Sequence, residues 1–110
     1  MIVATRTLTL KGPAGDIEIP ISISEPKHEG DAWSCVYEIG WPEGKETITA
    51  WGQDSVQALV VALQMIGAEI YSSTYHKSGD LRLDAPGNGY GFPVVSSIRD
   101  LLEGDDAKYF

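Results

Sequence analysis

The feature that most constrains this chain is the segment Asp54–Tyr71, DSVQALVVALQMIGAEIY. Its apolar residues recur at the spacing of an α-helix, and only two of its side chains, Asp54 and Glu69, are charged. A helix with so few charges has to be buried, either against a sheet of its own domain or against a partner. The segment therefore predicts a core helix, and it indicates no chemistry by itself.

The helix is predicted to span about residues 54–73. Asp54 can cap its N-terminus, and Gln57 can complete a capping box. Two adjacent apolar stripes run along it. The first stripe, expected to close the core over a sheet, contains Val56, Leu59, Val60, Leu63, Ile66, Gly67 and Ile70. The second stripe contains Ala58, Val61, Ala62 and Met65. A single sheet can cover only one stripe, so the second predicts a further element of the fold or a two-fold mate.

Before the helix, the apolar pattern alternates residue by residue, which predicts strands. The clearest alternation is that of Ile17, Ile19, Ile21 and Ile23. Four strands are predicted, at about residues 2–10, 16–24, 32–41 and 46–52, with a polar loop over Glu25–Asp31. Pro20 has no backbone N–H, so we expect the second strand to lie at a sheet edge or to carry a bulge. The short connections favour an antiparallel meander.

After the helix, Leu81 and Leu83 predict a short extra strand. A glycine-rich loop then leads to Pro93, which suits the first turn of a last helix over about residues 93–103. Gly104 can end that helix, and the remaining residues are expected to form a tail.

Strands followed by helices predict an α+β fold, with helices covering one face of the sheet. At 110 residues the chain has room for a single domain, residues 1–110. The single cysteine, Cys35, excludes an internal disulfide and fits a reducing compartment. The N-terminus lacks the pattern of a signal peptide, and the longest apolar run is too short to cross a membrane. A cytoplasmic protein is therefore expected.

The net charge of −8 at pH 7 argues against two classes of partner. Nucleic-acid binding needs basic side chains that neutralise phosphates, and anionic membrane surfaces repel an acidic protein. We therefore predict neither a nucleic-acid partner nor a membrane partner. The same charge suits solubility, and it equally suits the fast capture of a basic protein.

No constellation of residues points to catalysis or to a metal. His28 and His76 are far apart in sequence and Cys35 is the only cysteine, so no zinc pattern is present. His76 follows a run of hydroxyl residues, but a histidine also suits a polar helix end. Glu69 has no second carboxylate beside it by local spacing. The prediction is a protein without enzymatic activity, catalytic residues, metal or cofactor.

Two other patterns allow both a functional and a structural interpretation. The loop Gly87–Pro93 has glycines at alternate positions, and such loops can offer backbone N–H groups to a phosphate. It lacks the lysine of a P-loop, and its glycines also fit a tight turn. Trp33, Tyr37 and Trp41 share one strand face, which either fills the core or forms an exposed aromatic surface.

Several motifs resemble those of a family of small uncharacterised bacterial proteins. The family pattern has a Ser-x-Gln-Ala-Leu helix start, a Met-Ile-Gly in mid-helix and a closing Gly-Tyr-Gly-Phe-Pro. In this chain these are Ser55–Leu59, Met65–Gly67 and Gly89–Pro93. The resemblance covers roughly the last two-thirds of the chain. It implies membership of that family and carries no assigned activity.

The leading hypothesis is a non-enzymatic acidic binding protein, of the kind that inhibits a basic bacterial toxin as an immunity protein or antitoxin does. Nuclease toxins carry positive charge, so an acidic partner can be steered onto them. The predicted contact residues flank the third strand and are Glu25, Glu29, Asp31, Glu43 and Glu46. One alternative is a self-associating homodimer that uses the second helix stripe. Another is a small ligand-binding or enzymatic domain that uses the Gly87–Pro93 loop and His76.

Overall fold

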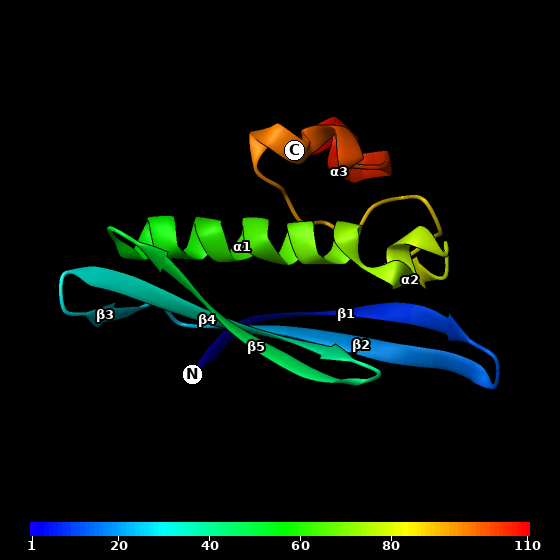
Figure 1. Cartoon of the computed structure of the whole chain (residues 1–110), viewed down its shortest axis with the longest axis horizontal. Coiled ribbons are helices and arrows are strands. Elements are labelled where there is room, and N and C mark those ends of the chain that lie inside the picture. Colours follow the sequence, from blue (N-terminus) through cyan, green and yellow to red (C-terminus); the bar gives the residue numbers. More distant parts are fainter.

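The computed structural model describes all residues, 1–110, and has three layers (Figure 1). An antiparallel sheet forms the first layer, a long helix lies across one of its faces, and the C-terminal segment lies on the outer side of that helix. The predicted α+β class is confirmed. The elements are β1 (Ile2–Gly12), β2 (Gly15–Ser24), β3 (Lys27–Glu29), β4 (Ala32–Trp41), β5 (Gly44–Gly52), α1 (Ser55–Ser72), α2 (Thr74–Lys77), β6 (Leu81–Arg82), the 3₁₀ helix η1 (Ser96–Leu101) and α3 (Gly104–Tyr109).

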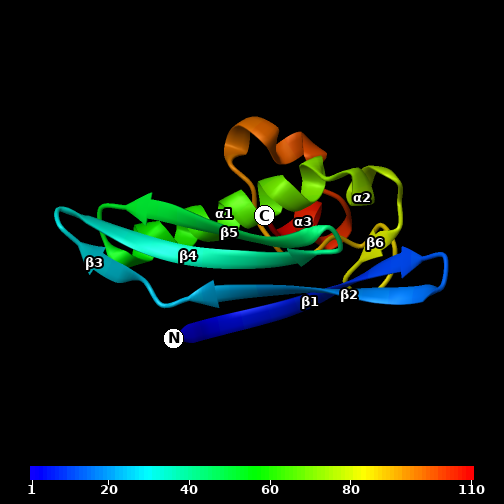
Figure 2. The same cartoon turned by 60° about the horizontal axis from the view of Figure 1, so that its bottom comes forward.

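The four long strands form an antiparallel meander in the order β1–β2–β4–β5, as predicted. The short strand β6 pairs with β1, where the extra strand was expected. A second short strand, β3, pairs with the start of β4 (Figure 2). The prediction of a polar loop there was wrong, because Gly30, with φ of 61°, closes a tight turn. His28 then stacks on Trp33 with ring centroids 5.0 Å apart.

Pro20 does not place β2 at an edge, since β2 lies between β1 and β4. The pairing between β2 and β4 covers only Ile21–Ile23 and stops at the proline. A Cβ on Gly40 of β4 would lie 2.9 Å from Cγ of Pro20, so glycine makes room for the ring. The missing N–H therefore falls where this ladder has ended, which is why an internal strand tolerates the proline.

The start of α1 follows the predicted capping box. The backbone N–H of Gln57 donates to Oδ1 of Asp54 at 2.7 Å, and Oε1 of Gln57 accepts from the backbone N–H of Gln53 at 2.6 Å. By length and composition alone, α1 could cross a membrane, with a mean hydropathy of 1.3 over 18 residues. In this structure it packs on β4 and β5, as the core helix of the domain.

The two stripes of α1 are oriented differently from the prediction. Ala58 and Ala62, assigned to the unpartnered stripe, are 0% exposed in the core, whereas Val56 and Val60 of the first stripe are 69% and 43% exposed. The reason is close approach: a Cβ on Gly52 of β5 would lie 2.3 Å from the backbone nitrogen of Ala58. Small residues let the helix backbone approach the sheet. The other two members of the second stripe, Val61 and Met65, are half-buried and pack against the core.

The C-terminal segment also differs from the prediction. Pro93 does not begin a helix over residues 93–103, because its carbonyl oxygen lies against Gly67, where a Cβ would be 2.0 Å away. The chain remains extended at Val95, forms η1, and begins α3 at Gly104, which was expected to end a helix. Gly67 therefore serves close packing with the C-terminal segment and not with the sheet.

The aromatic row of β4 faces the core, as the structural interpretation predicted. Tyr37 is 0% exposed, and the side chains of Trp33 and Trp41 are partly buried against the same core. The row therefore supports the helix, and only its last member, Trp41, also borders a cleft.

Candidate functional site

The predicted acidic surface divides into two groups at opposite ends of β4. Glu29 and Asp31 flank the β3–β4 turn and Glu25 precedes β3, whereas Glu43 and Glu46 belong to the β4–β5 turn and the start of β5. The ten residues of β4 place Glu29 and Asp31 about 30 Å from Glu43. Glu25 pairs with the N-terminal ammonium at 3.6 Å. The structure therefore does not bring the five carboxylates into one contact surface.

The second group lines a cleft of about 270 Å³, which we call the acidic cleft. One wall comes from the β4–β5 turn, and the other comes from the end of α1 and the start of α2. The cleft lies at the end of the sheet where α2 faces the β4–β5 turn (Figure 1). Its lining residues are Trp41, Glu43, Glu46, Glu69, Ser72, Ser73, Thr74 and Tyr75.

Two carboxylates meet at the inner end of the acidic cleft. Glu46 lies opposite Ile39 in the β4–β5 ladder, so its side chain is on the sheet face that α1 covers. The hydroxyl of Tyr37 donates a hydrogen bond to Oε2 of Glu69 at 3.1 Å. The side chain of Glu46 lines the same cleft beside Glu69. Burial, followed by the interaction with Glu46, raises the pKa of Glu69 to about 7, against a smaller lowering by Tyr37.

Adjacent carboxyl groups favour holding one proton between them, because two adjacent negative charges repel. Local spacing in the sequence placed no carboxylate beside Glu69, but the fold brings Glu46 next to it. Glu46 comes from β5 and Glu69 from α1, so local spacing in the sequence could not reveal the pair. Burial and the charge of Glu69 raise the pKa of the Tyr37 hydroxyl, which keeps its proton and donates a hydrogen bond to Oε2 of Glu69.

The outer wall of the acidic cleft is aromatic. The rings of Trp41 and Tyr75 stack with centroids 5.3 Å apart and an angle of 21° between their planes. The hydroxyl of Tyr75 donates to Oε1 of Glu43 at 2.8 Å, and this hydrogen bond raises the pKa of Tyr75. The contact links the β4–β5 turn to α2 across the mouth of the cleft.

No basic side chain neutralises the acidic cleft. The four ion pairs of the protein do not involve Glu43, Glu46 or Glu69. The nearest lysine in sequence, Lys45, pairs with Glu38 on the other face of the sheet at 3.5 Å. No group of three or more histidine, cysteine, aspartate or glutamate side chains is arranged to hold a metal ion.

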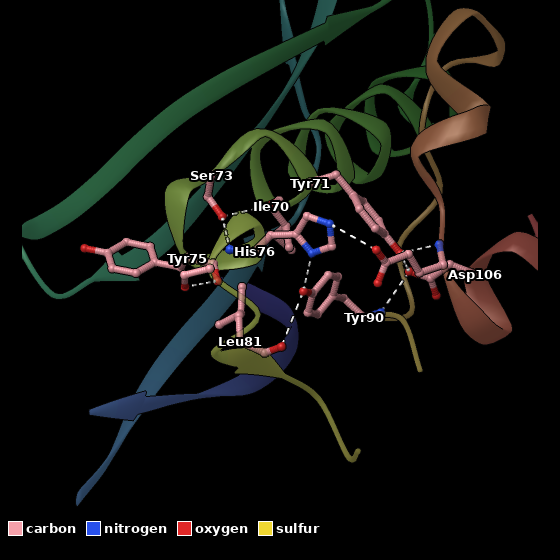
Figure 3. Close-up of polar contacts among 10 residues, drawn as sticks. Ile70, Tyr71, Ser73, Tyr75, His76, Leu81, Tyr90 and Asp106 are labelled. Atoms are coloured by element: carbon pink, nitrogen blue, oxygen red, sulfur yellow. Dashed lines mark hydrogen bonds and ion pairs between the residues drawn. The ribbon is translucent and has the colours of Figure 1, made fainter. Parts of the chain in front are cut away.

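The remaining candidate residues lie elsewhere. Cys35 is buried, and burial raises the pKa of its thiol. His76 belongs to a second polar cluster, in which its Nδ1 lies 2.6 Å from the hydroxyl of Tyr90 (Figure 3). Asp106, from the predicted tail, accepts hydrogen bonds in the same cluster. His28 stacks on Trp33 far from both sites.

Sequence similarity to a known family covers the whole acidic cleft but not Asp106 of the second polar cluster. A family described as a domain of unknown function, DUF6968, matches residues 4–94. The match includes every residue of the acidic cleft and ends before α3. Neither the curated proteins nor the solved structures contain a match to this chain.

We expect Glu69→Gln to stabilise the protein at pH 8 and to leave its stability near pH 4 unchanged. The folded protein retains a proton on Glu69 up to a pKa of about 7, against an ordinary value of 4.5. The contribution of Glu69 to the free energy of unfolding is therefore fully present below about pH 4.5 and is lost as the pH rises through about 7. Glutamine imitates the protonated acid, so the gain is about 1 kcal/mol at pH 8 after allowance for solvent screening.

Urea unfolding of wild type and variant across this pH range measures the difference. Glu18→Gln is the matched control, because Glu18 is exposed on β2 and forms no ion pair. A constant difference between wild type and Glu69→Gln at all pH values would contradict the shared proton.

Proposed function

Because the chain belongs to the DUF6968 family, whose function is unknown, we propose its function from the acidic cleft: it is a non-enzymatic binding protein that receives a cationic group of a protein partner there. One observation carries the proposal. Three glutamates that lack any basic counterpart line a cleft whose remaining wall is a stacked Trp41–Tyr75 pair.

The chemistry of the acidic cleft matches an ammonium or guanidinium group. Carboxylates form charge-assisted hydrogen bonds with such groups, and a guanidinium can bind a carboxylate through two parallel bonds. The faces of Trp and Tyr attract cations through the negative charge above their rings. The volume of about 270 Å³ is open to solvent on one side and suits the end of a lysine or arginine side chain.

Long-range charge adds to this local complementarity. The net charge of −8 attracts a basic protein at a distance, and this attraction weakens when salt screens it. The C-terminal end of α1, at Ser72, carries the partial negative charge of the helix dipole into the wall of the cleft. An association rate that falls steeply with ionic strength is therefore expected for a basic partner.

The shared proton makes the binding dependent on pH. A cation near Glu69 favours its ionised form, so binding near pH 7 releases the proton that Glu46 and Glu69 share. The cleft therefore carries more negative charge when a cation is bound than when it is empty. We expect weaker binding at pH 5, where the proton must be displaced from a carboxyl group well below its pKa.

A basic toxin that an immunity-type inhibitor neutralises is one partner that fits this chemistry. Such a toxin would insert a lysine or arginine into the acidic cleft toward Glu46 and Glu69, while Glu43 lies at the rim of the contact. Of the predicted surface, only Glu43 and Glu46 support the proposal. Glu25, Glu29 and Asp31 lie at the far end of β4 and would contact a partner only across a much larger interface.

The direct test uses acetyl-arginine-amide as the probe, followed by NMR at pH 7.5. The expected result is a saturable shift of the Trp41 indole N–H and of the amides around Tyr75. Glu46→Gln should weaken binding about fivefold, which corresponds to the loss of about 1 kcal/mol of charge interaction. Glu29→Gln removes the same charge at the opposite end of β4 and serves as the control. Equal effects of the two substitutions, or shifts at the β3–β4 turn, would refute the cleft as the binding site.

One observation favours a second candidate, an enzyme that uses acid–base chemistry. A carboxyl group with a pKa of about 7 beside a second carboxylate, in a cleft, is suited to proton transfer. No nucleophile with a neighbouring base lines the cleft. Binding without turnover therefore fits the geometry better.

Self-association through the second helix stripe has little support, because Ala58 and Ala62 are in the core. Its apolar surface on α1 reduces to Val56 and Val60, beside the half-buried Leu59. Scattered exposed apolar residues of this kind are common on monomeric proteins.

A further inference from the structure

Asp106 is the most deeply buried charged residue of the protein, at 1% exposure. Its carboxylate accepts hydrogen bonds from the hydroxyl of Tyr71 at 2.6 Å and from the backbone N–H groups of Tyr90 and Gly91, each at 2.8 Å (Figure 3). Three donors thus converge on one carboxylate. Two of them are consecutive backbone N–H groups of the glycine-rich loop, an arrangement that binds anions in many proteins.

Contacts that do not involve Asp106 hold these three donors in place. Tyr71 belongs to the core helix α1. The guanidinium of Arg6, on β1, donates to the carbonyl oxygen of Gly91 at 2.7 Å, which fixes the loop to the sheet. The hydroxyl of Tyr90 contacts Nδ1 of His76 at 2.6 Å. All these residues lie within residues 4–94, which match the family, whereas Asp106 lies outside them.

Gly89 leaves room for the carboxylate of Asp106 to approach the loop. Its φ is 84°, and a Cβ there would lie 2.6 Å from the carboxyl carbon of Asp106. The loop therefore combines a backbone conformation that favours glycine with a space that an added side chain would fill. The backbone N–H groups that this loop offers at Tyr90 and Gly91 bind a carboxylate of the same chain.

Few contacts besides those of Asp106 attach the segment that supplies it. We call residues 95–110 the C-terminal strap, and only Leu102 and Asp106 are buried in it. Its largest apolar side chains, Tyr109 and Phe110, are 69% and 46% exposed. Besides Asp106, the strap is held by the backbone N–H of Glu103, which donates to the hydroxyl of Tyr71 at 3.2 Å. Two further contacts are that of Glu103 with His76 at 3.5 Å and that of the Asp105 N–H with the carbonyl oxygen of Asn88 at 3.2 Å.

We propose that Tyr71 and the Gly89–Gly91 loop form a carboxylate receptor, that Asp106 is its intramolecular ligand, and that detachment of the C-terminal strap opens the receptor to a carboxylate from another molecule. The ligand class is a carboxylate, from either a small acid or an acidic peptide segment. This site is separate from the acidic cleft and does not depend on the function proposed for it. The strap therefore acts as an autoinhibitory element, since it competes with any such ligand.

The test removes the intramolecular carboxylate from the full chain and supplies one from solution. Asp106→Ala leaves a space for formate beside the three donors. Formate should raise the thermal midpoint of this variant by about 5 °C with saturation, more than sodium chloride of equal ionic strength does. Asp105→Ala is the matched control, because Asp105 is exposed and its side chain forms no hydrogen bond. Adding Tyr71→Phe to Asp106→Ala should weaken the response to formate.

A peptide of residues 100–110, and the same peptide with Asp106→Asn, distinguish the sources of the carboxylate. Tighter binding of the unmodified peptide than of formate to the Asp106→Ala variant supports an acidic segment as the ligand. Stabilisation by formate alone supports a small acid. If neither ligand stabilises the variant more than it stabilises wild type, the proposal is overturned.

Amide hydrogen exchange of the wild-type protein gives a second test that requires no folded variant. The N–H groups of Tyr90 and Gly91 should exchange at the rates of the strap amides, and faster than those of α1, because the strap detaches without unfolding the core. Formate should then speed the exchange of the strap amides, because it binds only after the strap has detached, and it should not speed that of Tyr90 and Gly91, whose N–H groups it holds. Exchange of both groups only with the core of α1 would show that the strap does not detach.

Discussion

Replacement of Asp106 by alanine should lower the free energy of unfolding by about 3–5 kcal/mol, the largest effect we expect from one side chain. The carboxylate is 1% exposed and accepts from Tyr71, Tyr90 and Gly91. Its removal leaves three buried donors without an acceptor, and each such donor costs about 1–3 kcal/mol before water enters the space. Urea unfolding monitored by far-UV circular dichroism measures the loss.

Asp105→Ala provides the comparison, because the neighbouring carboxylate is exposed and forms no side-chain hydrogen bond. Its effect should lie within about 0.5 kcal/mol. Equal effects of the two substitutions would mean that the C-terminal strap does not dock through Asp106.

Ala62→Leu should destabilise the protein by about 2–3 kcal/mol, because the core between α1 and the sheet has no space for a larger side chain. Ala62 is 0% exposed, and the contact of Gly52 with Ala58, one turn earlier, shows how closely the helix approaches β5. Thermal unfolding of the variant and of wild type at the same pH measures the change.

Val60→Leu is the matched control on the opposite side of the helix. Val60 is 43% exposed, so one added methylene there should change stability by less than about 0.5 kcal/mol. The observed orientation of α1 and the one expected from periodicity predict opposite orders for these two substitutions. A larger loss for Val60→Leu than for Ala62→Leu would show that α1 is turned as the periodicity alone suggested.

The parts of the fold that depend on local pattern were predictable from the sequence. Neighbouring residues alone determine the alternation in β2 and β4 and the cap formed by Asp54 and Gln57. The structure contains both strands and the cap. The orientation of α1 is different, because it depends on close approach to Gly52. A prediction from helical periodicity favours large apolar residues on the face that covers the sheet. It therefore assigned Val56 and Val60 to that face and the alanines to the second stripe.

Both polar sites depend on contacts between residues distant in sequence. Glu46 and Glu69 are paired because the inward face of β5 meets the end of α1, which no local spacing reveals. Residues 105–110 were expected to form a tail, and Asp106 is one of them. One signal was available: an aspartate pair, Asp105 and Asp106, follows the glycine-rich loop along the sequence. That the loop receives Asp106 could be seen only in the folded chain.

The most direct measurement for the acidic cleft is the pH titration of the Glu69 side-chain carboxyl carbon by NMR, with and without acetyl-arginine-amide. Without the probe, the midpoint should be about 7, because burial and Glu46 favour the protonated form. With saturating probe it should move to lower pH, since a bound cation favours the ionised form. A midpoint near 4.5 that is the same in both titrations would contradict both the shared proton and the binding of a cation in the cleft.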